Sequence, residues 1–177
     1  MKRTLLLLLF LLPTLIYGTE NQCKKSIYLA NPMGFSPLEK SLILPRIVEK
    51  LEALDLEVIE PFARYGHLDF TKPGVPYQVG QICLSEVEAC DAIFAVINGT
   101  PPDEGVLIEL AYAMALGKEI FLFRDDWRKC SDSDIYPLNI MIFSGLSEDG
   151  WQQSYYTSLE DIVDPNKRLS AFAKENL

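Results

Sequence analysis

Glu109 is the one charged residue in an apolar segment, residues 106–116, whose sequence is VLIELAYAMAL. No Lys or Arg lies three or four positions away to pair with it inside a helix. A helix that is apolar on all sides is buried, and an unpaired buried carboxylate is costly. Glu109 must therefore be compensated across the fold, be protonated, or line a polar cavity. The helix dipole near the first turn favours an ionised, nucleophilic carboxylate, while the competing interpretation is a structural ion pair with a distant arginine.

Two further carboxylates could act beside Glu109. Asp103 lies six residues upstream in the loop 98–105, NGTPPDEG, although an aspartate near glycine also commonly makes a turn or caps a helix. Asp91 begins an apolar segment, where a cap at a strand end is the simpler interpretation. Three carboxylates at one site suit glycoside chemistry. One attacks carbon, one handles a proton and one positions the substrate, and an anion stabilises the oxocarbenium-like transition state.

Other chemistries find little support in the 177 residues. The one histidine, His67, cannot build a histidine-rich metal site, and the sequence carries neither a serine elbow nor a Cys–His pairing. The sequence also lacks a GxGxxG segment and a Walker lysine loop, which cradle dinucleotide and NTP cofactors. The net charge of -9 disfavours a nucleic-acid polymer as partner.

Strand-like and helix-like segments alternate along the chain and must position these side chains. Short apolar runs predict strands at 26–30, 56–59, 92–97, 119–123 and 138–143, and apolar residues at helical spacing predict helices at 37–54, 77–90, 106–116 and 159–172. This alternation predicts one α/β domain with a parallel sheet of about five strands and helices on both faces. A polar and aromatic loop is expected over 61–76, long enough to suggest a function. Ligands of such folds bind beyond the carboxyl ends of the strands, which here carry Asn31 and residues 62–67, 98–105 and 124–126.

The first eighteen residues differ from the rest of the chain. A short basic start precedes about fourteen apolar residues, fewer than a bilayer span needs, so residues 1–18 are expected to be a secretory signal peptide, with an uncleaved anchor as the alternative. An exported protein, periplasmic or secreted, can form disulfides, but the pairing of its four cysteines is left open. Cys83 and Cys90 lie two turns apart on one predicted helix, too far for a bridge, and buried free thiols are expected.

The chain resembles the nucleoside 2-deoxyribosyltransferase family, which includes nucleotide N-hydrolases. Residues 27–30, IYLA, resemble the opening strand with its tyrosine, and residues 90–95, CDAIFA, resemble the strand start that bears an aspartate. Residues 103–118, DEGVLIELAYAMALGK, match the signature best, and residues 139–141 resemble a further Asn-x-Met segment. Many relatives have an acidic residue where this chain has Cys83.

The resemblance implies a flavodoxin- or Rossmann-like domain over residues 25–177 that needs no metal or organic cofactor. It implies double displacement, in which Glu109 attacks the anomeric carbon of a 2'-deoxynucleoside and Asp103 helps protonate the departing base. Tyr28 would hold Glu109, and Asp91 would position the sugar or the nucleophile. The implied substrate-binding residues are Asn31, Phe35, Asn98, Gly105, Asn139 and Met141, the last two often from a neighbouring subunit of a homo-oligomer.

Two alternatives stay open. Water in place of a second base would make the chain a deoxynucleoside or deoxynucleotide N-glycosidase, and Lys40 and Arg46 are then distant candidates for holding a phosphate. A non-catalytic, exported nucleoside-binding module would keep the pocket without the chemistry.

Overall fold

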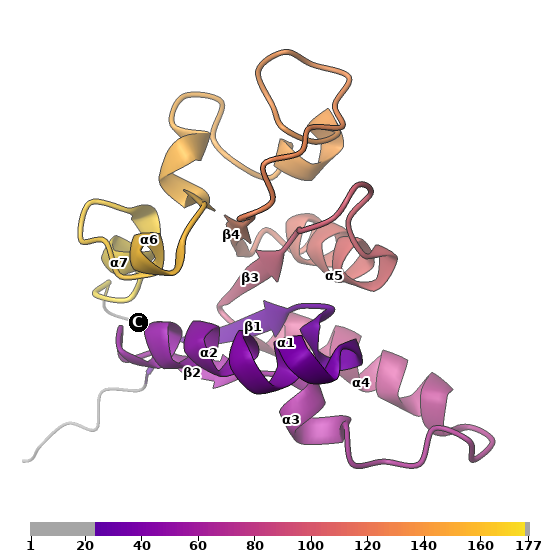
Figure 1. The fold of residues 1–177 in the computed structure, drawn as a ribbon. Coiled ribbons are helices and arrows are strands. Elements are labelled where there is room, and N and C mark those ends of the chain that lie inside the picture. Colours follow the sequence, from indigo (N-terminus) through magenta and orange to yellow (C-terminus); the bar gives the residue numbers. More distant parts are fainter. Residues whose placement is uncertain (1–23, 176–177) are drawn as a thin grey trace, which may run out of the picture.

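The computed structural model describes residues 24–175, and the expected signal peptide and Cys23 lie outside them. Five parallel strands form one sheet in the order β2-β1-β3-β4-β5 (Figure 1). The strands are β1 (Ser26–Ala30), β2 (Glu57–Ile59), β3 (Ala92–Val96), β4 (Glu119–Phe123) and β5 (Tyr155–Tyr156). This flavodoxin-like arrangement confirms the predicted fold class and sheet. None of the helices in residues 24–175 combines the length and the apolar character that a membrane crossing requires.

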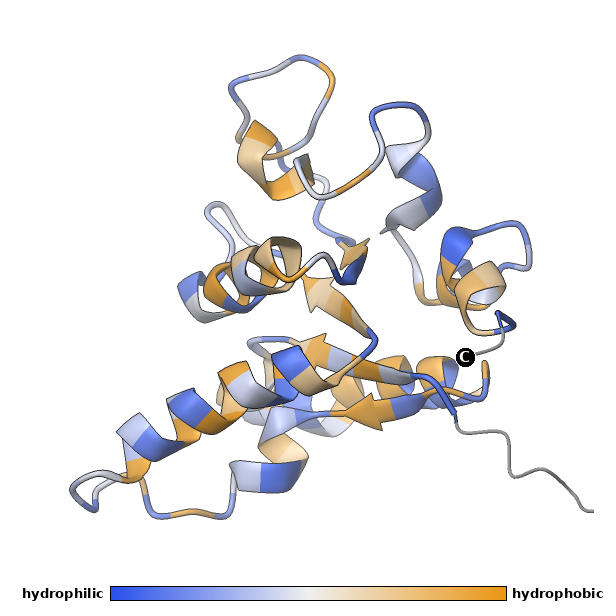
Figure 2. Ribbon diagram, turned by 180° about the vertical axis from the view of Figure 1, so that it is seen from behind, coloured by the Kyte–Doolittle hydropathy of each residue, from blue (hydrophilic) through white to orange (hydrophobic). Residues whose placement is uncertain are grey.

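Helices cover both faces of the sheet because successive strand residues point to opposite sides. On one face, Ile27 and Leu29 of β1 pack in a cluster with α2 (Leu44–Glu52), α6 (Leu159–Ile162) and α7 (Arg168–Phe172). On the other face, Tyr28 and Ala30 pack with α4 (Val75–Ala89) and α5 (Glu104–Ala115). Figure 2 shows that the strands between these layers are mostly hydrophobic, as a sheet buried on both faces requires. Tyr28 therefore points toward the layer that carries α5.

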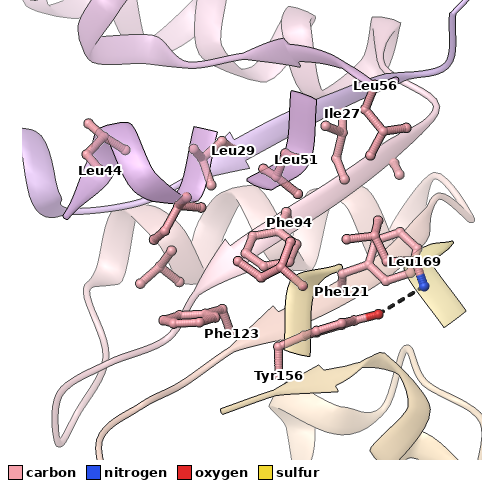
Figure 3. Close-up of a cluster of buried hydrophobic side chains, with 14 of the residues drawn as sticks. Ile27, Leu29, Leu44, Leu51, Leu56, Phe94, Phe121, Phe123, Tyr156 and Leu169 are labelled. Carbon is pink, nitrogen blue, oxygen red and sulfur yellow. Dashed lines mark hydrogen bonds between the residues drawn. The ribbon is translucent and has the colours of Figure 1, made fainter. Parts of the chain in front are cut away.

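The edge strand β5 has two residues, and a buried tyrosine anchors it. Tyr156 is fully buried and contacts the rings of Phe94 and Phe121 in the cluster of Figure 3. Its hydroxyl oxygen accepts a hydrogen bond of 2.9 Å from the backbone N–H of Leu169, so α7 is tied to the same side chain. Burial of one aromatic side chain contributes about 1.5–3 kcal/mol, which explains how so short a strand stays on the sheet.

Several predicted boundaries shift. The helix expected over 37–54 is split into α1 (Pro37–Leu42) and α2, which has Pro45 in its first turn. The loop expected over 61–76 contains α3 (Pro61–Tyr65), and the helix expected over 159–172 is interrupted between α6 and α7. Three short 3-10 helices complete the described elements: η1 (Met33–Phe35), η2 (Ile140–Phe143) and η3 (Trp151–Ser154).

The strand predicted at 138–143 is wrong. Those residues end in η2, whose start is capped by the Asn139 carbonyl oxygen accepting the Met141 N–H, and the fifth strand is β5. Leu138, Ile142 and Phe143 are buried against α5, which gives an apolar run without a strand. The cysteines Cys83, Cys90 and Cys130 are free, as expected, but only Cys90 is buried: Cys83 is half-buried and Cys130 is exposed.

Candidate active site

The carboxylate of Glu109 contacts the hydroxyl of Tyr28. Strand alternation turns Tyr28 toward α5, and the third residue of β1 thereby reaches the second turn of that helix. The Tyr28 hydroxyl donates a hydrogen bond of 2.6 Å to Oε1 of Glu109. Bonds between a hydroxyl and a carboxylate are among the strong ones. Within residues 24–175 Glu109 forms no ion pair, so tyrosine and not a distant arginine compensates it.

Burial makes Glu109 a weaker acid than an ordinary glutamate. Desolvation raises the pKa of Glu109 to about 7, with a smaller contribution from the nearby charge of Asp103, while the hydrogen bond from Tyr28 opposes the rise. Burial, together with the adjacent Glu109 carboxylate, raises the pKa of Tyr28 far above its usual range, so the phenol stays a proton donor. The pair thus holds a carboxylate that changes charge near neutral pH.

Asp103 stands on the same wall of the site as Glu109. It is the N-cap of α5, and its Oδ1 accepts a 3.0 Å hydrogen bond from the Val106 N–H. The cap interpretation and the pocket interpretation are therefore both correct for its position, because Asp103 also lines the cavity next to Glu109. Gly105 leaves room for this carboxylate: a Cβ there would lie 3.1 Å from Asp103 Oδ1.

The cavity before these acids has a volume of about 380 Å³, within the range of small-molecule sites. Its acidic wall comes from α5, and Val79 and Cys83 of α4 lie beside it. The cavity also has an aromatic wall, which comes from η1, α3 and the segment that follows α3: Phe35, Phe62, Tyr65 and Phe70. The rings of Phe35 and Phe62 meet edge to face with centroids 4.9 Å apart. A planar, mostly apolar ligand group fits against such a wall, with its polar end toward the acids.

Most of the side chains predicted for the site come together here. Glu109, Asp103, Asn31, Phe35 and Gly105 line the cavity, and Tyr28 bonds to Glu109 behind it. The sequence predicts a long loop over 61–76, but its pattern does not identify Phe62, Tyr65 or Phe70 as residues of the site. Their signal was the aromatic content of a segment that follows a strand.

Asn98, Asn139 and Met141 do not line this cavity. Asn98 exchanges two hydrogen bonds with Asp125, donating to its Oδ1 at 2.6 Å and accepting from its N–H at 3.1 Å. Asn139 caps η2, and Met141 is 68% exposed. A role for the last two at a neighbouring subunit stays a prediction.

The position of Asp91 corrects the expectation that it acts beside Glu109. It lies at the amino end of β3, where its Oδ2 accepts hydrogen bonds of 2.7 Å and 2.9 Å from the N–H and hydroxyl of Ser26. Parallel strands place their carboxyl ends at one edge of the sheet, and a five-residue strand separates its two ends by about 13 Å. Asp91 thus joins the starts of β1 and β3, as a strand-end cap would.

Comparisons with known proteins bear on the family and the fold of the chain. Residues 27–141 match the family model described as nucleoside 2-deoxyribosyltransferase. The chain has no significant match among curated protein sequences.

Solved structures share the fold at low sequence identity. A 2-deoxyribosyltransferase from Bacillus psychrosaccharolyticus is 22% identical, with a TM-score of 0.62 over 78% of this chain and 90% of that one. A 2-desoxiribosyltransferase from Leishmania mexicana is 24% identical, with a TM-score of 0.62 over 86% and 99%. A conserved protein from Enterococcus faecalis V583 is 19% identical, with a TM-score of 0.63 over 80% and 96%. The family model spans more than half of the sequence, and the chain therefore belongs to the nucleoside 2-deoxyribosyltransferase family.

Proposed function

We propose that this protein exchanges the nucleobase of 2'-deoxynucleosides through a deoxyribosyl ester of Glu109. The observation that carries the proposal is the partly buried Glu109 carboxylate, held by Tyr28 at 2.6 Å and open to a cavity of about 380 Å³. A carboxylate in this setting is oriented by one strong hydrogen bond and is only partly solvated, which suits a nucleophile. Membership of the family supports the same reaction class.

The steps follow from the two walls of the cavity. The base stacks on the aromatic wall, and the sugar carbon that bears it faces Glu109. A carboxylate oxygen of Glu109 bonds to that carbon as the carbon–nitrogen bond breaks, and the bond's electron pair leaves with the base. Asp103 transfers a proton to the departing base and takes one from the incoming base, whose nitrogen then displaces Glu109 and restores the carboxylate.

The test is base exchange combined with intact-mass analysis. Thymidine and adenine incubated with the protein should yield deoxyadenosine, and brief exposure to a deoxynucleoside should add one deoxyribosyl group to the peptide that contains Glu109. Glu109→Gln should abolish both signals. Glu104→Gln is the matched control, because Glu104 lies in the first turn of the same helix and is exposed to solvent. Nucleoside affinity with neither exchange nor adduct in the wild type would instead identify a binding module.

One observation favours a second candidate, an N-glycosidase that acts on deoxynucleotides. Lys40 of α1 lines the cavity, and its Nζ lies 3.4 Å from where a Cβ of Gly66 would stand. Lys40 has no ion-pair partner within the described chain, so its charge is free to meet a phosphate. Water in place of the second base would then release a sugar phosphate.

Comparing each deoxynucleoside with its 5'-monophosphate separates the two candidates. Under the second candidate, Lys40→Ala raises KM for the monophosphate and leaves KM for the nucleoside unchanged, and free sugar phosphate accumulates without base exchange. Arg46→Ala is the control, since Arg46 is exposed and does not line the cavity. Equal KM values for both substrates in the wild type would reject the phosphate role of Lys40.

A further inference from the structure

Two buried polar side chains, Asn31 and Glu60, join the loops that carry the aromatic wall. Asn31 follows β1 and is 6% exposed, while Glu60 follows β2 and is 7% exposed. The Asn31 amide donates a 3.0 Å hydrogen bond to Oε1 of Glu60. A buried carboxylate is retained only when its hydrogen bonds are well satisfied. This contact therefore links the segments that follow β1 and β2 at the cavity, which Asn31 lines.

The side-chain hydrogen bonds of Asn31 are made within the protein. Its amide nitrogen donates to Glu60 and to the Leu29 carbonyl oxygen, the latter at 3.1 Å, and its carbonyl oxygen accepts from the Met33 N–H at 3.0 Å. An asparagine amide has two N–H donors, and both are used. Although Asn31 lines the cavity, it has no free N–H to offer a substrate.

The carboxylate of Glu60 accepts hydrogen bonds from the start of α3. Its Oε1 accepts from the Phe62 N–H at 3.1 Å, and its Oε2 accepts from the Ala63 N–H at 2.6 Å. These bonds cap the helix that presents Phe62 and Tyr65 to the cavity. Because Asn31 bonds to the same carboxylate, the path from η1 to α3 is short and consists of strong, charge-assisted contacts.

The two segments also meet in the wall itself. Phe35 of η1 packs edge to face on Phe62 of α3. Gly34 lies so close to Phe62 that a Cβ at position 34 would be 1.9 Å from the ring. Within the described residues, η1 and α3 form no backbone hydrogen bond with each other, although their side chains together form the wall. The contact between Asn31 and Glu60 therefore sets the spacing of these two segments.

We propose that Asn31 and Glu60 are positioning residues that fix the aromatic wall, and that they determine substrate binding rather than the chemical step. The inference rests on the proposed function, because the wall is assigned to the base. Glu109 and Tyr28 lie on α5 and β1, and neither side chain forms a hydrogen bond with Asn31 or Glu60. Loss of the pair should therefore raise KM while kcat stays nearly constant, the signature of lost uniform binding.

The experiment uses Asn31→Asp, which keeps the shape of the side chain, removes both N–H donors and sets a carboxylate against Glu60. KM for deoxynucleosides should rise about tenfold or more, with kcat changed less than about threefold. Amide hydrogen exchange measured without substrate should become faster at Met33, Phe62 and Ala63. Asn166→Asp is the control, because Asn166 also donates to a neighbouring acid but is exposed and distant in sequence from the cavity.

A double variant guards against simple misfolding. Asn31→Asp combined with Glu60→Gln puts the amide at position 60 and the acid at position 31, so a donor again faces an acceptor between the two side chains. KM and the amide hydrogen exchange rates at Met33 and Ala63 should move partly back toward wild type, whereas Phe62, whose N–H then faces the amide nitrogen introduced at position 60 instead of Oε1, should still exchange fast. The proposal is overturned if amide hydrogen exchange in Asn31→Asp is the same as in the wild type, or if kcat falls while KM stays constant. Amide hydrogen exchange can be measured without enzymatic activity. A wild type that exchanges no nucleobases therefore rejects the proposed function, while amide hydrogen exchange still decides whether Asn31 and Glu60 position the wall.

Discussion

Replacing Tyr28 by phenylalanine tests whether one hydroxyl keeps Glu109 ionised. The hydroxyl is the single group that donates a hydrogen bond to the carboxylate among the described residues, and it is fully buried with the rest of the side chain. Desolvation raises the pKa of Glu109 to about 7, and the Tyr28 hydrogen bond acts against that rise. Tyr28→Phe keeps the ring and removes the opposing contribution, so the pKa of Glu109 should rise further.

The size of the effect follows from the hydrogen bond. A bond to a charged group contributes about 1.5–3 kcal/mol, which corresponds to about 1 to 2 pH units in the midpoint of ionisation. With a pKa of about 7, about a tenth of Glu109 is ionised at pH 6 in the wild type. In the variant that fraction falls to about a hundredth or a thousandth, so kcat/KM at pH 6 should drop a further ten- to a hundredfold.

The assay is the pH profile of kcat/KM for base exchange between pH 5 and 9.5. The wild type should show an acidic limb with a midpoint near 7, and the limb of Tyr28→Phe should lie about 1 to 2 pH units higher, with the two rates converging at the alkaline end. Tyr65→Phe is the matched control, since Tyr65 also lines the cavity but donates to Glu86. A uniform loss at every pH, with the midpoint unchanged, would refute the role assigned to Tyr28.

Three further variants probe the site and its support. Glu109→Gln should raise the free energy of unfolding at pH 8 by on the order of 3 kcal/mol and leave it unchanged at pH 4. The pKa of Glu109 is about 7 in the folded protein against a usual value of 4.5, so the wild type loses stability as the pH rises between those values. Urea unfolding at both pH values measures the difference. Asp91→Asn should cost about 1–3 kcal/mol in thermal or urea unfolding while kcat per folded molecule is retained, since its partner Ser26 lies at the far end of the strand. Gly34→Ala should raise KM by displacing Phe62, whereas Gly80→Ala, which meets nothing within 4 Å, should not.

The fold was predictable where the sequence pattern is strong. Four of the five strands and the helix α5 follow from apolar runs and from glycine at the helix end. The expected burial of α5 on all sides is wrong: Val106, Leu110 and Ala113 are buried, but Ile108 is 60% exposed. The strand predicted at 138–143 fails because an apolar run records burial and not strand pairing. The true edge strand is two residues long, and its stability comes from Tyr156 in the core, a tertiary contact that no local pattern contains.

A residue of the site could be predicted where its type conflicts with its neighbours in the sequence. Glu109 stood out because a lone carboxylate in an apolar helix needs compensation, and Tyr28 supplies it. Asn31 and Asp91 show the limit of the same reasoning: each is a polar residue at a strand end, yet hydrogen bonds to Glu60 and to Ser26 decide what each one does. Those partners lie 29 and 65 residues away in the chain. Strand direction determines the edge of the sheet at which a residue lies. Partners that are distant in the sequence determine whether its hydrogen-bonding groups are free to bind a substrate. A prediction made from polar residue type alone therefore overestimates the number of substrate contacts.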